Sequence, residues 1–125
     1  MKKILIIDDD AALREVMKTV LSGSYDLREA GTKADGLALM ATFKPDLVIL
    51  DVMMESLNSG FEAAREIRAD RKFRNVKILM MTNVDRETRI DYKAEAGDAA
   101  WLPVDDYLVK PVDPTTLLAK VQKLL

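Results

Sequence analysis

The sequence contains no cysteine and no histidine, and both absences narrow the chemistry that the chain can carry. Without cysteine there are no disulfides and no thiolate-bound metal, which agrees with a location in a reducing cytoplasm. Without histidine there is no histidine catalysis, no phosphohistidine on this chain and no imidazole-bound zinc. No apolar run approaches the ~20 residues of a membrane-spanning helix, so no membrane partner is expected.

Positive and negative residues are nearly balanced, with 19 lysines and arginines against 21 aspartates and glutamates. The net charge is −2, so this domain alone is not expected to bind nucleic acid. The chain has 125 residues, of which 49% are hydrophobic, and this is enough for one folded domain with a core of its own. We therefore expect a single globular domain over residues 1–125.

Short apolar runs, each followed directly by a polar or charged residue, are the most informative feature of the sequence. The residues that follow these runs are Asp8 and Asp9, Asp51, Thr82 and Lys110. Continuous apolar runs of this length are typical of strands buried on both faces of a parallel sheet. Because the site of an open α/β sheet lies outside the carboxyl ends of its strands, these five residues are expected to meet at one edge.

Strands and helices are expected to alternate five times, which favours parallel pairing with helices on both faces. The expected strands cover residues 3–7, 25–29, 47–51, 76–81 and 107–109. The expected helices follow an Asp10 cap, cover residues 32–43, 60–69 and 85–96, and begin at Asp113-Pro114. The first helix is expected to end near Gly23 and to bury Leu13, Val16, Met17, Val20 and Leu21. Thr32 and Asp35 resemble a capping box.

Three neighbouring carboxylates and a lysine suit phosphoryl chemistry. Ionised Asp8, Asp9 and Asp51 would repel one another, at a cost of about 4 kcal/mol for a pair ~4 Å apart at an effective dielectric of ~20. A Mg²⁺ ion would relieve this repulsion, since it prefers oxygen ligands. Asp51 could then attack phosphorus while Lys110 and Thr82 stabilise the phosphoryl oxygens. Taken singly, each of these residues is better explained as a solvated cap or a turn residue, whereas all five together at strand ends favour the phosphoryl site.

Four motifs together resemble the receiver domain of bacterial two-component response regulators over essentially the whole chain. They are ILIIDDD at residues 4–10, PDLVILDVMM at 45–54, MMT at 80–82 and DYLVKP at 106–111. The resemblance implies a flavodoxin-like, doubly wound (βα)5 three-layer sandwich whose five-stranded parallel sheet has the order 2-1-3-4-5. It also implies a phospho-accepting switch that assists its own phosphorylation but is not a turnover enzyme.

Each motif carries an implied role for a residue of this chain. The resemblance implies that Asp51 accepts phosphate from a sensor histidine kinase, a phosphotransfer protein or a small phosphodonor. It implies that Asp9 and Asp51 bind Mg²⁺ directly together with the Met53 carbonyl, whereas Asp8 helps through water. Lys110 would pair with the phosphoryl oxygens.

The same resemblance implies a switch and an output surface. Thr82 would move toward the phosphate and let Tyr107 rotate inward, altering the face made by the fourth helix, fifth strand and fifth helix. The implied partners are a downstream effector protein or domain and a phosphorylation-dependent homodimer. The segment 97–105 is longer than usual in the family, and its Trp101 and Leu102 form either a partner surface or a local apolar cover.

Two alternatives stay open at this point. A haloacid-dehalogenase-type phosphatase would use Asp8 as nucleophile and Asp10 as acid/base, but it leaves Asp51 unexplained. A phosphorylation-independent scaffold is kept open because Glu55 and Asn83 depart from the family pattern. The cognate kinase and pathway do not follow from the sequence, which fits either a stand-alone receiver or one excised from a longer protein.

Overall fold

The computed structural model describes residues 1–52, 59–83 and 104–125. Strands and helices alternate along the chain as far as residue 83, and residues 104–125 add a further strand and helix. The elements are β1 (Lys3–Ile7), α1 (Ala11–Leu21), β2 (Asp26–Ala30), α2 (Lys33–Phe43), β3 (Leu47–Asp51), α3 (Ser59–Ala69), the 3-10 helix η1 (Arg71–Phe73), β4 (Lys77–Asn83), β5 (Asp106–Lys110) and α5 (Pro114–Leu124). The expected helix at 85–96 lies outside the described residues.

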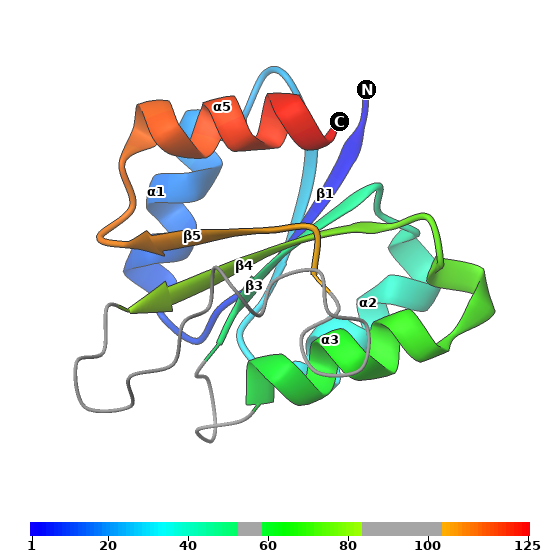
Figure 1. Ribbon diagram of the computed structural model, residues 1–125. Coiled ribbons are helices and arrows are strands. Elements are labelled where there is room, and N and C mark those ends of the chain that lie inside the picture. The colour runs from blue at the N-terminus through cyan, green and yellow to red at the C-terminus, as the bar shows by residue number, and fades with distance from the viewer. Residues whose placement is uncertain (53–58, 84–103) are drawn as a thin grey trace.

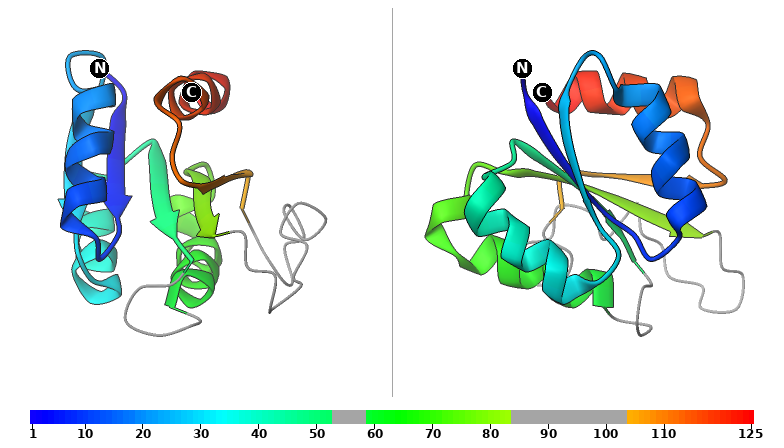
Figure 2. Two further views of the ribbon diagram at one scale, coloured as in Figure 1. Left: turned by 90° about the vertical axis from the view of Figure 1, so that its left-hand side faces the viewer. Right: turned by 180° about the vertical axis from the view of Figure 1, so that it is seen from behind.

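The five strands form one parallel sheet in the order β2-β1-β3-β4-β5. Figure 1 shows α1 and α5 on one side of this sheet and α2 and α3 on the other, and the views in Figure 2 agree. The predicted doubly wound three-layer sandwich and its strand order are therefore confirmed.

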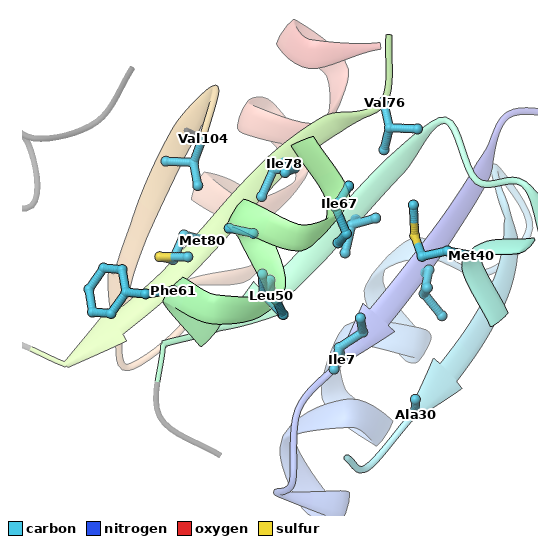
Figure 3. Packing of buried hydrophobic residues seen from close by; sticks show 14 of the residues in the cluster. Ile7, Ala30, Met40, Leu50, Phe61, Ile67, Val76, Ile78, Met80 and Val104 are labelled. Carbon is cyan, nitrogen blue, oxygen red and sulfur yellow. The ribbon is translucent and has the colours of Figure 1, made fainter. Parts of the chain in front are cut away.

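The apolar runs of the strands supply two cores, one on each face of the sheet. Side chains alternate across a strand, so Leu5 and Ile7 join the cluster under α2 and α3 while Ile4 and Ile6 join the one under α1 and α5. Figure 3 shows the first cluster, where Phe61 and Ile67 of α3 lie over the sheet. All four residues of the first run are fully buried, which explains why it is apolar without alternation.

Helix starts follow the side-chain caps that the sequence predicted. Asp10 accepts a hydrogen bond from the Leu13 amide, and Asp113 accepts one from Thr116 ahead of the proline at the start of α5. Thr32 accepts from the Asp35 amide and begins α2. Such caps contribute about 1 kcal/mol each and fix where the chain leaves the sheet edge.

Some boundaries and one buried position differ from the prediction. Val16 was expected in the core but is 44% exposed, because it lies at the edge of the α1 apolar stripe, where neighbouring residues are about 100° apart. The second strand begins and ends one residue later than expected. β4 extends beyond Met81, because Thr82 and Asn83 pair with β5. Gly23 lies just beyond the cap residue Ser22, with a φ of 90°.

Candidate functional site

The carboxyl edge of the sheet brings three predicted acids together. Asp8 follows β1 directly and Asp51 ends β3. The residues before them, Ile7 and Leu50, are paired in register in these adjacent strands, so both acids reach the same edge. Carboxylate oxygens of Asp8, Asp9 and Asp51 all lie within 4.8 Å of one another. The first and last of these side chains are buried and Asp9 is exposed, so the cluster opens to solvent on one side.

Backbone hydrogen bonds fix the loop that carries Asp8 and Asp9. The Asp8 amide donates to the Ala30 carbonyl at the end of β2 at 3.1 Å. The Asp10 amide donates to Asp8 Oδ1 at 2.9 Å, and the Asp10 side chain caps α1. The loop is thus tied to β2 on one side and to α1 on the other, which limits how far its carboxylates can separate.

Lys110, the last residue of β5, provides the positive charge of the site. Its Nζ lies 3.2 Å from Asp51 Oδ1 and 3.8 Å from Asp8 Oδ2. The lysine side chain is 17% exposed, so this pairing is only partly screened by water. Lys110 therefore lies beside both buried carboxylates, at the sheet edge where the strand ends were predicted to meet.

Asp8 is the acid that the protein environment perturbs most clearly. Its pKa is raised to about 6, mainly by burial and also by the negative charge of Asp51, although the Asp10 amide and Lys110 act in the opposite direction. Its Oδ2 atom is buried and accepts no hydrogen bond from the described residues. A buried carboxylate oxygen without a hydrogen-bond donor, beside two further carboxylates, is a donor set that fits a hard divalent cation such as Mg²⁺.

We expect Asp8→Asn to stabilise the metal-free protein at neutral pH. A carboxyl whose pKa rises from 3.8 unfolded to about 6 folded destabilises the folded state at pH 7 by about 3 kcal/mol. This penalty disappears as the pH falls through about 6 toward 4, because the folded state then takes up the proton first. Removal of the charge should thus raise the free energy of unfolding by about 2 kcal/mol at pH 7.

Urea unfolding of both proteins in EDTA, at pH 7 and at pH 4.5, measures this difference. The advantage of the variant should shrink at the lower pH, since the wild-type carboxyl is then largely protonated in the folded state. Added Mg²⁺ should stabilise the wild type more than the variant. An Asp8→Asn protein that is less stable than the wild type at pH 7 would contradict the prediction.

The remaining predicted site residues are placed as follows. Thr82 is buried near the carboxyl end of β4, one residue beyond the Met81 that pairs with Asp51. Tyr107 is half-buried on β5, and Lys120 Nζ of α5 lies 5.5 Å from its ring centroid. Met53, Trp101 and Leu102 lie outside the described residues.

Two residues that sequence reasoning did not select also contact the site. Arg14 of α1 donates from Nη1 to the Asp8 carbonyl at 2.6 Å. Gly60 of α3 donates its amide to the Val52 carbonyl at 2.9 Å, directly after Asp51. Neither has a signal in the sequence pattern, because an arginine within a helix and a glycine near the start of a helix are both common.

None of the helices within residues 1–52, 59–83 and 104–125 has the length and apolar character needed to cross a membrane.

Comparison with known proteins places this geometry in a family. The family model for the response regulator receiver domain matches residues 4–122. RpaA of Synechocystis, a DNA-binding dual master transcriptional regulator, is 35% identical over 100% of this chain and 49% of its own length. PhoB of Pseudomonas aeruginosa, a phosphate regulon transcriptional regulatory protein, is 34% identical over 99% of this chain and 52% of its own length.

A similar solved structure is that of the chemotaxis response regulator CheY4 of Vibrio cholerae. It superposes with a TM-score of 0.82 at 28% identity and covers 100% of this chain and 99% of that one. The chain thus spans about half the length of the curated relatives named above, but essentially all of this structural relative. Because the family model matches nearly the whole sequence, this chain belongs to the response regulator receiver domain family of two-component signalling.

Proposed function

We propose that the domain accepts a phosphoryl group on Asp51 in a Mg²⁺-dependent reaction, with a sensor histidine kinase or a phosphotransfer protein as donor. The observation that carries this proposal is the buried Asp51 carboxylate, whose Oδ1 lies 3.2 Å from Lys110 Nζ beside two further acids. A buried nucleophile next to a fixed cation is the arrangement that phosphoryl transfer to a carboxylate requires.

The three acids would hold the metal in this proposal. Asp9 and Asp51 would be direct ligands and Asp8 would act through water, while the Met53 carbonyl is a further proposed ligand outside the described residues. When bound, Mg²⁺ supplies positive charge that offsets the carboxylates and the incoming phosphoryl oxygens. The orientation of the carboxylates is prepared by the protein itself, through the Asp10 amide on Asp8 and Lys110 on Asp51.

The transfer itself exchanges one bond for another. An oxygen of the Asp51 carboxylate forms a bond to phosphorus as the phosphorus–nitrogen bond of the donor phosphohistidine breaks, and the electron pair of that bond returns to the imidazole. Lys110, already within 3.2 Å of Asp51, would pair with the phosphoryl oxygens. The Thr82 hydroxyl would donate a hydrogen bond to them from the neighbouring strand.

We further propose that the phosphorylated site communicates with β5 and α5 through Thr82 and Tyr107. The two residues occupy adjacent paired strands, since Met80 is in register with Tyr107 and Thr82 with Val109. The output surface, Trp101 and Leu102 included, would contact a downstream effector or a second copy of the domain. Relatives such as RpaA, a DNA-binding regulator about twice as long as this chain, support a DNA-binding effector domain in a longer protein.

Intact mass spectrometry after incubation with Mg²⁺ and acetyl phosphate or phosphoramidate tests the proposal. We expect one phosphoryl adduct on the wild type and none on Asp51→Asn, which keeps the shape of the nucleophile but removes its charge. Asp35→Asn, at an exposed acid in the first turn of α2, is the matched control and should be modified like the wild type.

Two other results would contradict the proposal. Phosphate release with steady turnover that depends on Asp8 would indicate the phosphatase alternative. Absence of any adduct, from small donors and from phosphorylated histidine kinases alike, would indicate the phosphorylation-independent scaffold.

A further inference from the structure

We propose that Arg14 is a positioning residue that sets the Mg²⁺ affinity of the site by holding the Asp8–Asp9 backbone. The inference rests on the proposed function, since it concerns the same acids. Arg14 lies in the first turn of α1, and its side chain is 17% exposed. Its Nη1 donates to the Asp8 carbonyl at 2.6 Å, and its Nε donates to Glu29 Oε1 of β2 at 3.2 Å.

The hydrogen bond from Arg14 acts on the site through the backbone carbonyl of Asp8. The amide of Asp8 is bonded to Ala30 and its Oδ1 is bonded to the Asp10 amide. The carbonyl of Asp8 accepts the hydrogen bond from Arg14. That carbonyl belongs to the peptide that joins Asp8 to Asp9. The guanidinium thus restrains the peptide plane between two acids that would hold the metal.

The guanidinium is itself fixed by an ion-pair network. Glu29 accepts from Arg14, and its other oxygen lies 2.7 Å from Lys18 Nζ, which also pairs with Glu15 at 2.6 Å. Hydrogen bonding from Lys18, and secondarily from Arg14, holds the pKa of Glu29 below its usual value, so the anchor is charged at neutral pH. Glu29 of β2 therefore fixes the orientation of the Arg14 guanidinium, and the guanidinium in turn restrains the backbone that follows β1.

The geometry requires an arginine and leaves space for it. A guanidinium donates in two directions from one rigid plane, whereas a lysine places a single nitrogen and cannot reproduce both contacts. A Cβ atom at position 31 would lie 3.3 Å from Arg14 Nη1, so Gly31 gives the guanidinium room beside the end of β2. Groups that orient metal ligands in this way typically account for a 10- to 100-fold difference in metal affinity.

Calorimetric titration of the full chain with Mg²⁺ tests the inference, using Arg14→Gln and Arg14→Lys. We expect both variants to bind Mg²⁺ about tenfold or more weakly than the wild type. Glu29→Gln should show a smaller loss, because it loosens the guanidinium without removing it. Arg28→Gln is the matched control, since Arg28 contacts Asp26, the Leu27 carbonyl and the Phe43 ring and none of the three acids, and it should bind like the wild type.

Phosphoryl uptake from phosphoramidate at increasing Mg²⁺ provides a second readout. The Arg14 variants should need more Mg²⁺ for half-maximal rate but approach the wild-type rate at saturation, because Asp51 and Lys110 are unchanged. A purely structural role would lower stability in urea without this split. Wild-type Mg²⁺ affinity in either folded Arg14 variant would overturn the inference, as would a saturating rate that stays low.

The outcomes separate the inference from the proposed function. A wild type that binds Mg²⁺ but accepts no phosphate contradicts the proposed function, while the Mg²⁺ affinities still judge Arg14. A wild type that binds no Mg²⁺ overturns both. If Arg14→Gln does not fold, Arg14→Lys decides. Failure of both to fold would overturn the inference, because Arg14 would then hold the domain together as a whole.

Discussion

Replacing Lys110 with alanine is expected to slow phosphoryl uptake at Asp51 by about 100-fold or more, comparable to the loss of one charge-stabilising donor in other active sites. Lys110 Nζ lies within 3.2 Å of Asp51 Oδ1 and 3.8 Å of Asp8 Oδ2. Its removal takes the positive charge away from two buried carboxylates and removes one of the groups proposed to stabilise the incoming phosphoryl oxygens. Mg²⁺ can offset only part of this charge, so saturating metal should not restore the rate.

The time course of intact mass with phosphoramidate at saturating Mg²⁺ measures this effect. Lys123→Ala removes an exposed lysine from the last turn of α5 and controls for the change in net charge. Lys110→Arg keeps the charge but presents a planar group, so it should recover only part of the rate. A Lys110→Ala protein that is modified as fast as the wild type would show that the lysine contributes nothing to acceptance.

The sheet edge could be predicted because strand position alone decides which residues reach it. Asp8, Asp51 and Lys110 each end a short apolar run, and parallel strands in register carry such positions to one side of the sheet. This prediction needs no distances between residues, because every strand of a parallel sheet has its carboxyl end at the same edge. The family resemblance then supplied the strand order and the proposed direction of phosphate transfer.

Contacts that depend on how layers pack could not be predicted in the same way. The contact of Arg14 with Asp8 depends on how α1 packs on the sheet through core residues such as Met17. The burial of Val16 could not be predicted correctly, because the sequence does not show where the apolar stripe of a helix ends and its exposed face begins. Thr82 was expected after its strand but lies within it, since the extension of β4 depends on pairing with β5.

Substitution of Gly60 by alanine is expected to destabilise the domain strongly, by about 3 kcal/mol or more. A Cβ atom at this position would lie 2.5 Å from Val52 Cα and 2.6 Å from the Val52 carbonyl oxygen, and closer still to the Asp51 carbonyl oxygen. All three are backbone atoms. These atoms cannot move aside easily, because both polar groups of the Val52 backbone are held by hydrogen bonds. The Val52 amide donates to the Met81 carbonyl of β4, and the Val52 carbonyl accepts from the Gly60 amide.

Gly36→Ala is the matched control, because it also adds a Cβ to a glycine in a helix. There a Cβ would lie 2.8 Å from Ile7 Cγ1 and closer still to Cδ1, so a buried side chain has to shift instead of backbone, while alanine gains up to about 1 kcal/mol of helix propensity. Its free energy of unfolding should therefore fall by about 2 kcal/mol or less, which is a smaller loss than at Gly60. Urea unfolding of the two variants beside the wild type measures the difference.

The clash at Gly60 also bears on Asp51, because α3 begins against the backbone that carries the nucleophile. Gly60→Ala protein that remains folded at low temperature should accept phosphate more slowly than Gly36→Ala protein of the same concentration, since the Asp51 carbonyl must shift to admit the methyl group. Equal stability of the two variants would mean that α3 can slide away from β3 at little cost. A stable Gly60→Ala protein with a normal rate of uptake would show that the close approach of α3 does not position Asp51.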